Sequence, residues 1–158
     1  YRRQRQMCIR DRCNLLRRAY LSCLPLTEGT NKTLTYTSRV SCAYMPLDSP
    51  KMMEALLNLI VNALDAVSDN GSVQIILTKS NEQFVVSIID DGCGIAPKQL
   101  LTIFHPFTTT KPDGTGLGLP VAKRIIEGHG GHIRVSSAPN QGATFTFLLP
   151  CSFSSDKK

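Results

Sequence analysis

Residues 106–133 read PFTTTKPDGTGLGLPVAKRIIEGHGGHI, and they are the most informative stretch of the chain. A Gly-rich loop here leads into a predicted helix, and backbone N–H groups that are free at such a junction can hold phosphate. The loop is not a Rossmann fingerprint, because its third position is Leu119 and a loop precedes it, nor a Walker A loop, because no Gly-Lys-Ser/Thr follows. Lys111, just upstream, is suited either to reach phosphate oxygens or to remain in solvent.

Strands and helices are predicted on both sides of this loop. Helices are expected over residues 13–24, 50–67, 97–103 and 119–129, and strands over 33–37, 40–45, 72–79, 83–90, 132–136 and 143–149. Asp48 or Ser49 is expected to cap the second helix, with Pro50 in its first turn. The helical period places Met53, Leu57, Ile60, Leu64 and Val67 on the buried side of that helix. The mixture predicts an α+β fold, a sandwich of one mixed sheet covered on one face by helices.

The second helix also carries a stripe of polar residues. Asn58, Asn62 and Asp65 lie at positions i, i+4 and i+7, and therefore on one face of a helix that is otherwise strongly apolar. The stripe is either a solvated face or a surface that faces a bound phosphate and its metal ion. Amide and carboxylate oxygens are hard ligands, of the kind that Mg²⁺ accepts beside phosphate oxygens and water.

A third feature follows the apolar strand FVVSII, where residues 90–95 read DDGCGI. A strand that ends in an acidic residue and continues into two alternating glycines allows the backbone to come close to a flat ligand. The alternative is a simple acidic turn, and taken alone the motif does not decide between them.

The order and spacing of these features carry more information than each of them alone. NLIVNALDA (58–66), DDGCGI (90–95), FHPF (104–107) and GTGLGL (114–119) resemble the N, G1, F and G2 boxes of sensor histidine kinases. That family shares a superfamily with gyrase, Hsp90 and MutL, and the resemblance covers residues 46–150. It implies a Bergerat-type two-layer α/β sandwich that binds ATP and Mg²⁺.

The resemblance also assigns roles to single residues. Asn62 matches the Mg²⁺ ligand, Asn58 its companion near the phosphates, and Asp90 the acid that accepts a hydrogen bond from the adenine amino group. Guanine has an acceptor at that position, so a carboxylate would repel it. Phe104 and Phe107 match the hydrophobic anchors of a mobile lid. The remaining residues expected at the nucleotide are Asp65, Gly92, Gly94, Ile95, Phe107, Thr109, Lys111, Gly114, Thr115, Gly116, Leu117, Gly118, Leu119 and Thr144.

Two positions depart from the pattern of the family. Many relatives have Gly-Thr-x-Phe where residues 142–145 read Gly-Ala-Thr-Phe, so Ala143 lacks a hydroxyl that helps to bind adenine. We expect weaker binding at most. Asp91 stands where Asn is commoner, and we expect that change to be neutral.

The resemblance implies transfer of the γ-phosphoryl group of ATP to a His on a dimerisation helix, for relay to a response regulator. His105, His129 and His132 are followed by Pro, Gly and Ile, unlike a phosphoacceptor, which an acidic residue usually follows. We therefore expect no catalytic residue within this chain and an acceptor upstream of it. The expected partners are the protein's own dimerisation domain, a response regulator and a second copy, with no nucleic acid. The expected location is cytoplasmic, with membrane anchoring possible for the full-length protein.

Three other functions remain as alternatives. The first is an ATP hydrolase of the Hsp90 or MutL kind, which has a Glu as general base where this chain has Asn58. The second is a Ser/Thr kinase of the anti-sigma type, against which the helix before residue 25 counts mildly. The third is a nucleotide-sensing scaffold without catalysis, against which the complete set of boxes counts.

The ends of the chain are interpreted separately from the central domain. Residues 1–12 hold five Arg and one Asp, so +4 of the net charge of +6 lies there, and they resemble sequencing-adapter read-through more than a basic tail. Residues 13–25 are expected to be the end of a dimerisation helix, 26–151 the ATP-binding domain and 152–158 a polar tail. The six cysteines show no metal-ligand spacing and fit a reducing compartment. Only 6% of the chain is aromatic and Trp is absent, which disfavours a platform for stacking nucleic-acid bases.

Deleting residues 1–12 is expected to leave ATP affinity and melting temperature unchanged within error. The reason is that these residues hold most of the net charge but none of the residues assigned to the nucleotide. Calorimetric titration and a thermal melt of the two chains check this, and a large loss of either quantity would restore the basic stretch as a functional tether.

Overall fold

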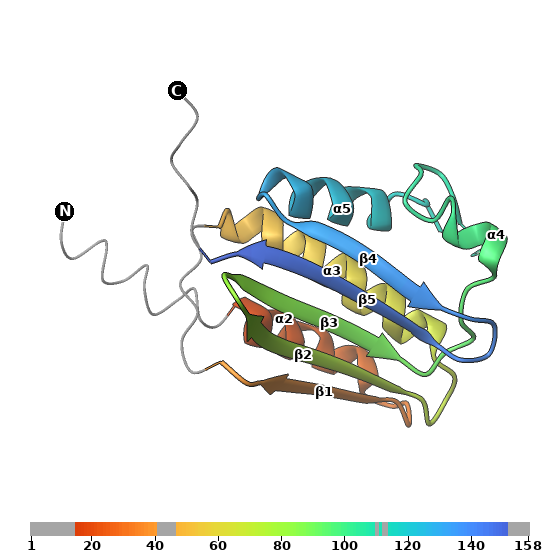
Figure 1. Cartoon of the computed structure of the whole chain (residues 1–158). Helices are drawn as coiled ribbons and strands as arrows, with labels where there is room; N and C mark the ends of the chain where they lie inside the picture. Colours follow the sequence, from red (N-terminus) through yellow and green to blue (C-terminus); the bar gives the residue numbers. More distant parts are fainter. Residues whose placement is uncertain (1–14, 41–46, 110, 112–113, 152–158) are drawn as a thin grey trace.

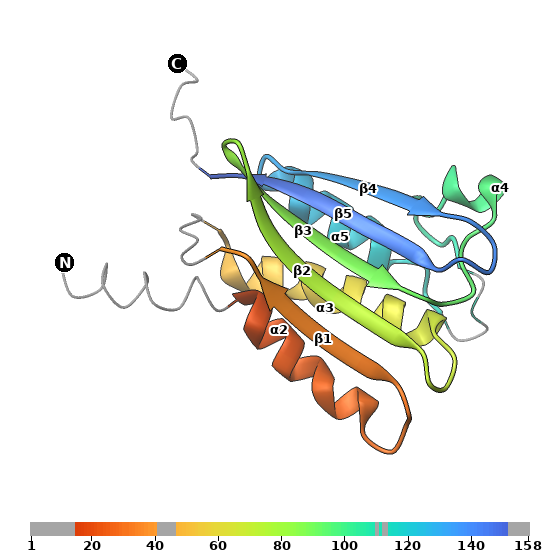
Figure 2. The same ribbon diagram turned by 60° about the horizontal axis from the view of Figure 1, so that its bottom comes forward.

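The helices and strands form one mixed sheet with helices on one face. A computed structural model of the chain describes residues 15–40, 47–109, 111 and 114–151. The elements are α2 (Leu15–Cys23), η1 (Leu24–Thr27), β1 (Thr33–Ser38), α3 (Ser49–Ala66), β2 (Ser72–Ser80), β3 (Gln83–Asp90), α4 (Pro97–Leu100), α5 (Gly118–Gly128), β4 (His132–Ser137) and β5 (Ala143–Pro150). The strand order is β1-β2-β3-β5-β4, with β1 parallel to β2 and the other pairs antiparallel. Figures 1 and 2 show α2, α3 and α5 on the same side of the sheet, which confirms the predicted two-layer α+β sandwich.

The core lies between that face of the sheet and the helices. Along β3 and β5 every second side chain is buried, as expected for strands of a sheet that is covered on one side. The prediction for α3 was wrong in part, because Met53 and Leu57 are only half-buried. The helix packs against α2 and α5 as well as the sheet, so its buried side is broader than one stripe. That side comprises Met52, Ala55, Leu56, Leu59, Ile60, Ala63 and Leu64.

The start of α3 is joined to the end of α5. Asp48 caps α3, as one of the two candidates predicted, by accepting a hydrogen bond from the Lys51 N–H at 3.2 Å. The Asp48 N–H donates to Nε2 of His129 at 3.0 Å, and Nδ1 of His129 lies 2.7 Å from the Ile125 carbonyl. These contacts fit the tautomer that carries its proton on Nδ1. They place the end of α5 beside the start of α3, so the two helices run antiparallel (Figure 1).

Several boundaries differ from the prediction. The helix expected over 97–103 ends at Leu100, and the residues after it form turns. The strand expected over 40–45 falls largely in residues 41–46, outside the described part, as do residues 1–14 and 152–158. Within the described ranges, none of the helices has the length and apolarity needed to cross a membrane.

Candidate functional site

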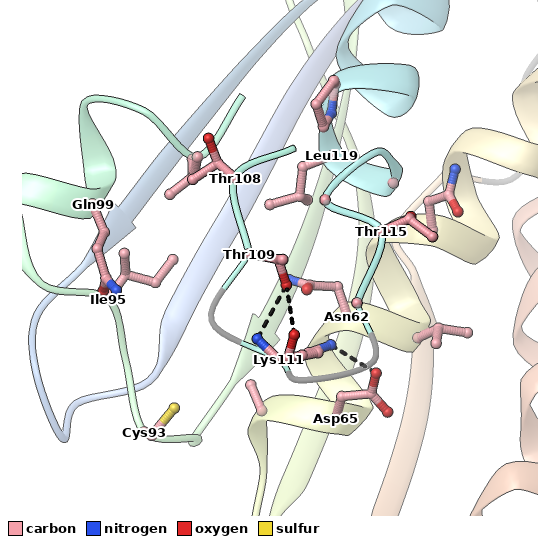
Figure 3. Close-up of a pocket in the computed structure, with 18 of the residues that line it drawn as sticks. Asn62, Asp65, Cys93, Ile95, Gln99, Thr108, Thr109, Lys111, Thr115 and Leu119 are labelled. Carbon is pink, nitrogen blue, oxygen red and sulfur yellow. Dashed lines mark hydrogen bonds and ion pairs between the residues drawn. The ribbon is translucent and has the colours of Figure 1, made fainter. Parts of the chain in front are cut away.

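A cleft of about 670 Å³ opens at the end of the sheet where β3 stops, a size typical of small-molecule sites. Its walls come from α3, the loop after β3, the region of α4, the segment before α5 and the start of α5 (Figure 3). The predicted residues that line it are Asn58, Asn62, Asp65, Gly94, Ile95, Thr109, Lys111, Gly114, Thr115, Gly116, Gly118 and Leu119. The structure therefore brings together the N, G1 and G2 stretches, which are far apart in the sequence.

The polar stripe of α3 faces this cleft. Asn58, Asn62 and Asp65 all line it, so the stripe is not an ordinary solvated face. The start of α5 lies next to it, since a Cβ placed on Gly118 would be 3.6 Å from Oδ1 of Asn58. The side-chain oxygens of the polar stripe on α3, which can bind a metal ion, thus lie beside the N-terminus of α5. Free N–H groups and the helix dipole favour an anion there.

Lys111 crosses the cleft to reach α3. Its Nζ lies 2.7 Å from Oδ2 of Asp65, and its own N–H donates to Oγ1 of Thr109 at 3.0 Å (Figure 3). Both charged side chains are about half exposed, 42% and 50%, and ion pairs of this kind contribute at most about 1 kcal/mol. Lys111 therefore lies with its ammonium group against the polar stripe of α3. Its ion pair with Asp65 is weak enough for a phosphate group to replace the carboxylate.

Asp90 is buried at the end of β3, with 5% of its surface exposed. Its Oδ1 accepts hydrogen bonds from the N–H groups of Gly92 at 3.0 Å and Ala143 at 3.1 Å. Burial raises the pKa of Asp90, and the two N–H donors oppose that rise. No described residue donates a hydrogen bond to Oδ2, so within the described part of the chain this oxygen has no protein partner and can accept a bond from a ligand.

The glycines after Asp90 are required by the protein's own backbone. Gly94 has φ +70°, and a Cβ there would lie 1.9 Å from the Ala138 carbonyl oxygen. A Cβ on Gly92 would lie 2.4 Å from the Ala66 carbonyl oxygen. The sequence suggested close approach to a ligand, whereas the structure shows that these glycines first allow the loop to fit between the end of α3 and the turn linking β4 and β5.

Gly94→Ala is expected to lower the free energy of unfolding by at least about 2 kcal/mol, because a side chain in the left-handed region is strained and this one would also overlap backbone. ATP affinity should fall with it, since Gly94 lines the cleft. Gly128→Ala is the matched control, because its Cβ would meet nothing within 4 Å and alanine favours a helix. Urea unfolding checks both variants, and equal stability of the two would contradict this account of the loop.

Some predicted residues lie away from the cleft. Asp90 and Gly92 stand just before its lining loop, and Leu117 is 39% exposed. Phe107, which was expected to anchor a lid, has φ +65° and is 77% exposed, so it does not pack against the core in this structure. Phe104 does pack, edge-to-face against Phe145 at 6.4 Å.

Thr144 also lies elsewhere. The alternation along β5 buries its two neighbours against the helices and places Thr144 on the opposite, uncovered face of the sheet. Ala143, the residue before it, is buried instead.

Other lining residues were not predicted from the sequence. They are Val61, Ala66, Cys93, Gln99, Ile103, Thr108 and Pro120. Helical spacing could have identified the first two, because they lie three and four residues after Asn58 and Asn62 on the same face of α3. The others depend on the path of the loops, which periodicity does not report.

Comparison with known proteins gives consistent results. The family described as "Histidine kinase-, DNA gyrase B-, and HSP90-like ATPase" matches residues 47–152. Sensor histidine kinase ZraS of Salmonella typhimurium is 42% identical over 118 residues, which are 74% of this chain and 25% of that kinase. The catalytic domain of histidine kinase ThkA, in a nucleotide-free form, has a TM-score of 0.79 at 31% identity and covers 87% of this chain and 90% of that one.

ThkA has also been solved in complex with the response regulator protein TrrA. That structure has a TM-score of 0.77 at 26% identity and covers 90% of this chain and 41% of that one. The chain spans about a quarter of the length of the curated relatives that it matches.

Proposed function

This chain belongs to the histidine kinase-, DNA gyrase B- and HSP90-like ATPase family, and we propose that it is the part of a sensor histidine kinase that holds Mg-ATP for phosphoryl transfer. The acceptor is a His on a dimerisation segment of the full-length protein, from which the phosphoryl group passes to an Asp of a response regulator. The full-length protein is a homodimer, and this domain acts in the cytoplasm.

The observation that carries this proposal is the arrangement of Asp90. Two backbone N–H groups hold Oδ1, while Oδ2 has no hydrogen-bond partner among the described residues, and Asp90 directly precedes the loop that lines the cleft. A carboxylate oxygen without a protein partner in a buried setting accepts a hydrogen bond from an amino group and repels an acceptor, which supports adenine over guanine. The side-chain oxygens of the polar stripe on α3 line the same cleft, which favours binding of the triphosphate and its metal ion there.

The donor set fits Mg²⁺. Among the described residues there is no cluster of three or more His, Cys, Asp or Glu side chains, so the protein would supply only part of the coordination. Mg²⁺ is commonly bound this way, through one or two hard protein oxygens with water and phosphate oxygens completing the octahedron. Asn62 would hold it through the amide oxygen, with Asn58 and Asp65 lining the cleft beside it. When bound, the ion neutralises charge on the phosphates.

The protein's own groups orient the triphosphate. The N–H groups of Thr115 and Gly116, just before α5, and of Gly118, its first residue, bind phosphate oxygens, and Lys111 exchanges Asp65 for a phosphate oxygen. Fixing the chain of phosphates in line with an incoming imidazole converts a bimolecular step into an effectively unimolecular one.

The acceptor histidine lies outside this chain. Both ring nitrogens of His129 are engaged, one by the Asp48 N–H and one with the Ile125 carbonyl, which supports a structural role for it. We propose that α2, which packs against α3 and β1, is the end of the second dimerisation helix and joins it to this domain. The complex of ThkA with a response regulator supports a partner of that class.

The test is to join this chain to a dimerisation segment that carries the acceptor His, in one polypeptide or in trans, and to add Mg-ATP labelled on the γ-phosphate. We expect a protein-bound phosphate that is stable to base and labile to acid, as phosphohistidine is, and no labelling of this chain alone. The same segment with its His replaced by Ala is the control. Failure to bind Mg-ATP would contradict the proposal at its first step, and labelling of the Ala control would contradict the assigned acceptor.

A further inference from the structure

The loop of residues 92–95, which we call the base-side loop, is held by hydrogen bonds on two sides. The Cys93 N–H donates to the Ala66 carbonyl at 3.2 Å, which ties the loop to the end of α3. The Asn140 N–H donates to the Cys93 carbonyl at 2.8 Å, which ties it to the turn between β4 and β5. These contacts use backbone atoms only, so they do not depend on which side chains the loop carries.

One side chain adds to this set of contacts. The Oγ of Ser137, the last residue of β4, accepts a hydrogen bond from the Ile95 N–H at 2.8 Å and donates to the Gly142 carbonyl at 2.6 Å. The hydroxyl thus connects the base-side loop to the residue that precedes β5. Ile95 lines the cleft, whereas Ser137 does not.

The same turn is linked to Asp90. The Ala143 N–H, one residue after Gly142, donates to Oδ1 of Asp90. The Ser137 hydroxyl therefore joins the backbone segment that orients the Asp90 carboxylate to the loop that forms the neighbouring wall of the cleft. A displacement of the loop relative to that segment would change the distance between the carboxylate and the wall.

We propose that Ser137 is a positioning residue for nucleotide binding, which sets the base-side loop against the Asp90 carboxylate before the nucleotide arrives. The inference rests on the proposed function. Without the hydroxyl, the half-buried Ile95 N–H has no acceptor at that point, so the Ile95 end of the loop loses an anchor although the backbone bonds of Gly92 and Cys93 remain, and that end has to be ordered when the ligand binds. Ordering a loop during binding lowers affinity, and a loop that is already ordered avoids that cost.

The experiment compares Ser137→Ala with Ser136→Ala in calorimetric titrations of this 158-residue chain with Mg-ATP and with Mg-ADP. Ser136 is the matched control, because it is the preceding residue of β4 and is exposed. Ser137→Ala should weaken both nucleotides by the same factor, about three- to tenfold, the range expected for one or two neutral hydrogen bonds. Ser136→Ala should leave both affinities unchanged, and Ser137→Thr, which keeps the hydroxyl, should restore them.

Urea unfolding of the same variants separates positioning from simple stabilisation. A residue that only stabilised the turn would lower the free energy of unfolding and leave the affinity of the folded chain unchanged, and that result would overturn the proposal. If Ser137→Ala does not fold, Ser137→Cys, which is nearly the same size, takes its place, and unchanged affinity in that variant would overturn the proposal equally. Absence of Mg-ATP binding by the unmodified chain would instead refute the proposed function.

Discussion

Asp90→Asn is expected to lower the affinity of this chain for ATP by tenfold or more. A hydrogen bond to a charged group is worth about 1.5–3 kcal/mol, and the amide would present either a donor or a weaker acceptor to the adenine amino group. The fold is expected to survive, because the Asn oxygen can accept the same two bonds from the Gly92 and Ala143 N–H groups. Calorimetric titration with ATP measures the loss.

Asp91→Asn is the control for this variant. The exposed Asp91 carboxylate accepts hydrogen bonds from the N–H and the hydroxyl of Ser72, the first residue of β2. It does not line the cleft. ATP affinity should therefore be unchanged in Asp91→Asn. Unchanged affinity in Asp90→Asn would remove Asp90 from the site.

The two aspartates also predict how binding and stability respond to acid. Burial raises the pKa of Asp90, so this carboxylate takes up a proton at a higher pH than an ordinary aspartate and loses its accepting charge there. Because its pKa is higher in the folded state, that protonation favours the fold. The two bonds from Ser72 lower the pKa of Asp91, so its contribution to stability is lost only when the pH falls through that lowered value. ATP affinity should therefore fall at a higher pH than the fold, which titrations and melts over a pH series can check.

Asn58→Glu is expected to raise ATP hydrolysis by this chain, by up to about 10²–10⁴-fold over a negligible rate. An amide cannot take a proton from water, whereas a carboxylate at this position in the cleft can act as a general base, and such a base supplies a factor of that size. The substitution should not create phosphoryl transfer to the chain itself, because no described histidine is placed as an acceptor. Steady-state phosphate release measures the rate.

Asn58→Gln is the matched control, since it has the length of Glu without its basicity. Its hydrolysis rate should remain at that of the unmodified chain. Brisk turnover by the unmodified chain would contradict the kinase assignment and favour the hydrolase alternative.

The bounds of the five strands β1 to β5 could be predicted from the sequence to within about one residue, because they depend on local composition, whereas the strand order could not. Residues 83–90 and 143–149 are rich in β-forming residues, and they form β3 and β5 with nearly those bounds, with every second side chain buried. The buried side of α3 could not be predicted in the same way. Its width depends on contacts with α2 and α5, which are tertiary, so Met53 and Leu57 were assigned to the core although both remain half-buried.

The candidate site shows the same division. The motifs identified the side chains of α3 and the glycines before α5, because helical spacing and loop composition are local features. Ser137 could not be found in this way, because the bond that gives it a role joins positions 42 residues apart in the chain. Thr144 was assigned to the nucleotide by resemblance, and the pleat of β5 directs it to the other face.

The ion pair between Lys111 and Asp65 has a consequence for ionic strength. In the empty cleft the Asp65 carboxylate already pairs with Lys111. When a triphosphate binds, Lys111 therefore exchanges this carboxylate for a phosphate group, so the number of its ion pairs does not increase. Added salt screens the pair in the empty cleft and the contact with phosphate alike, since both are exposed to solvent. The two effects oppose each other in the binding equilibrium. Lys111 therefore contributes to ATP affinity with little dependence on salt, although the ion pair that positions it in the empty cleft weakens as salt is added.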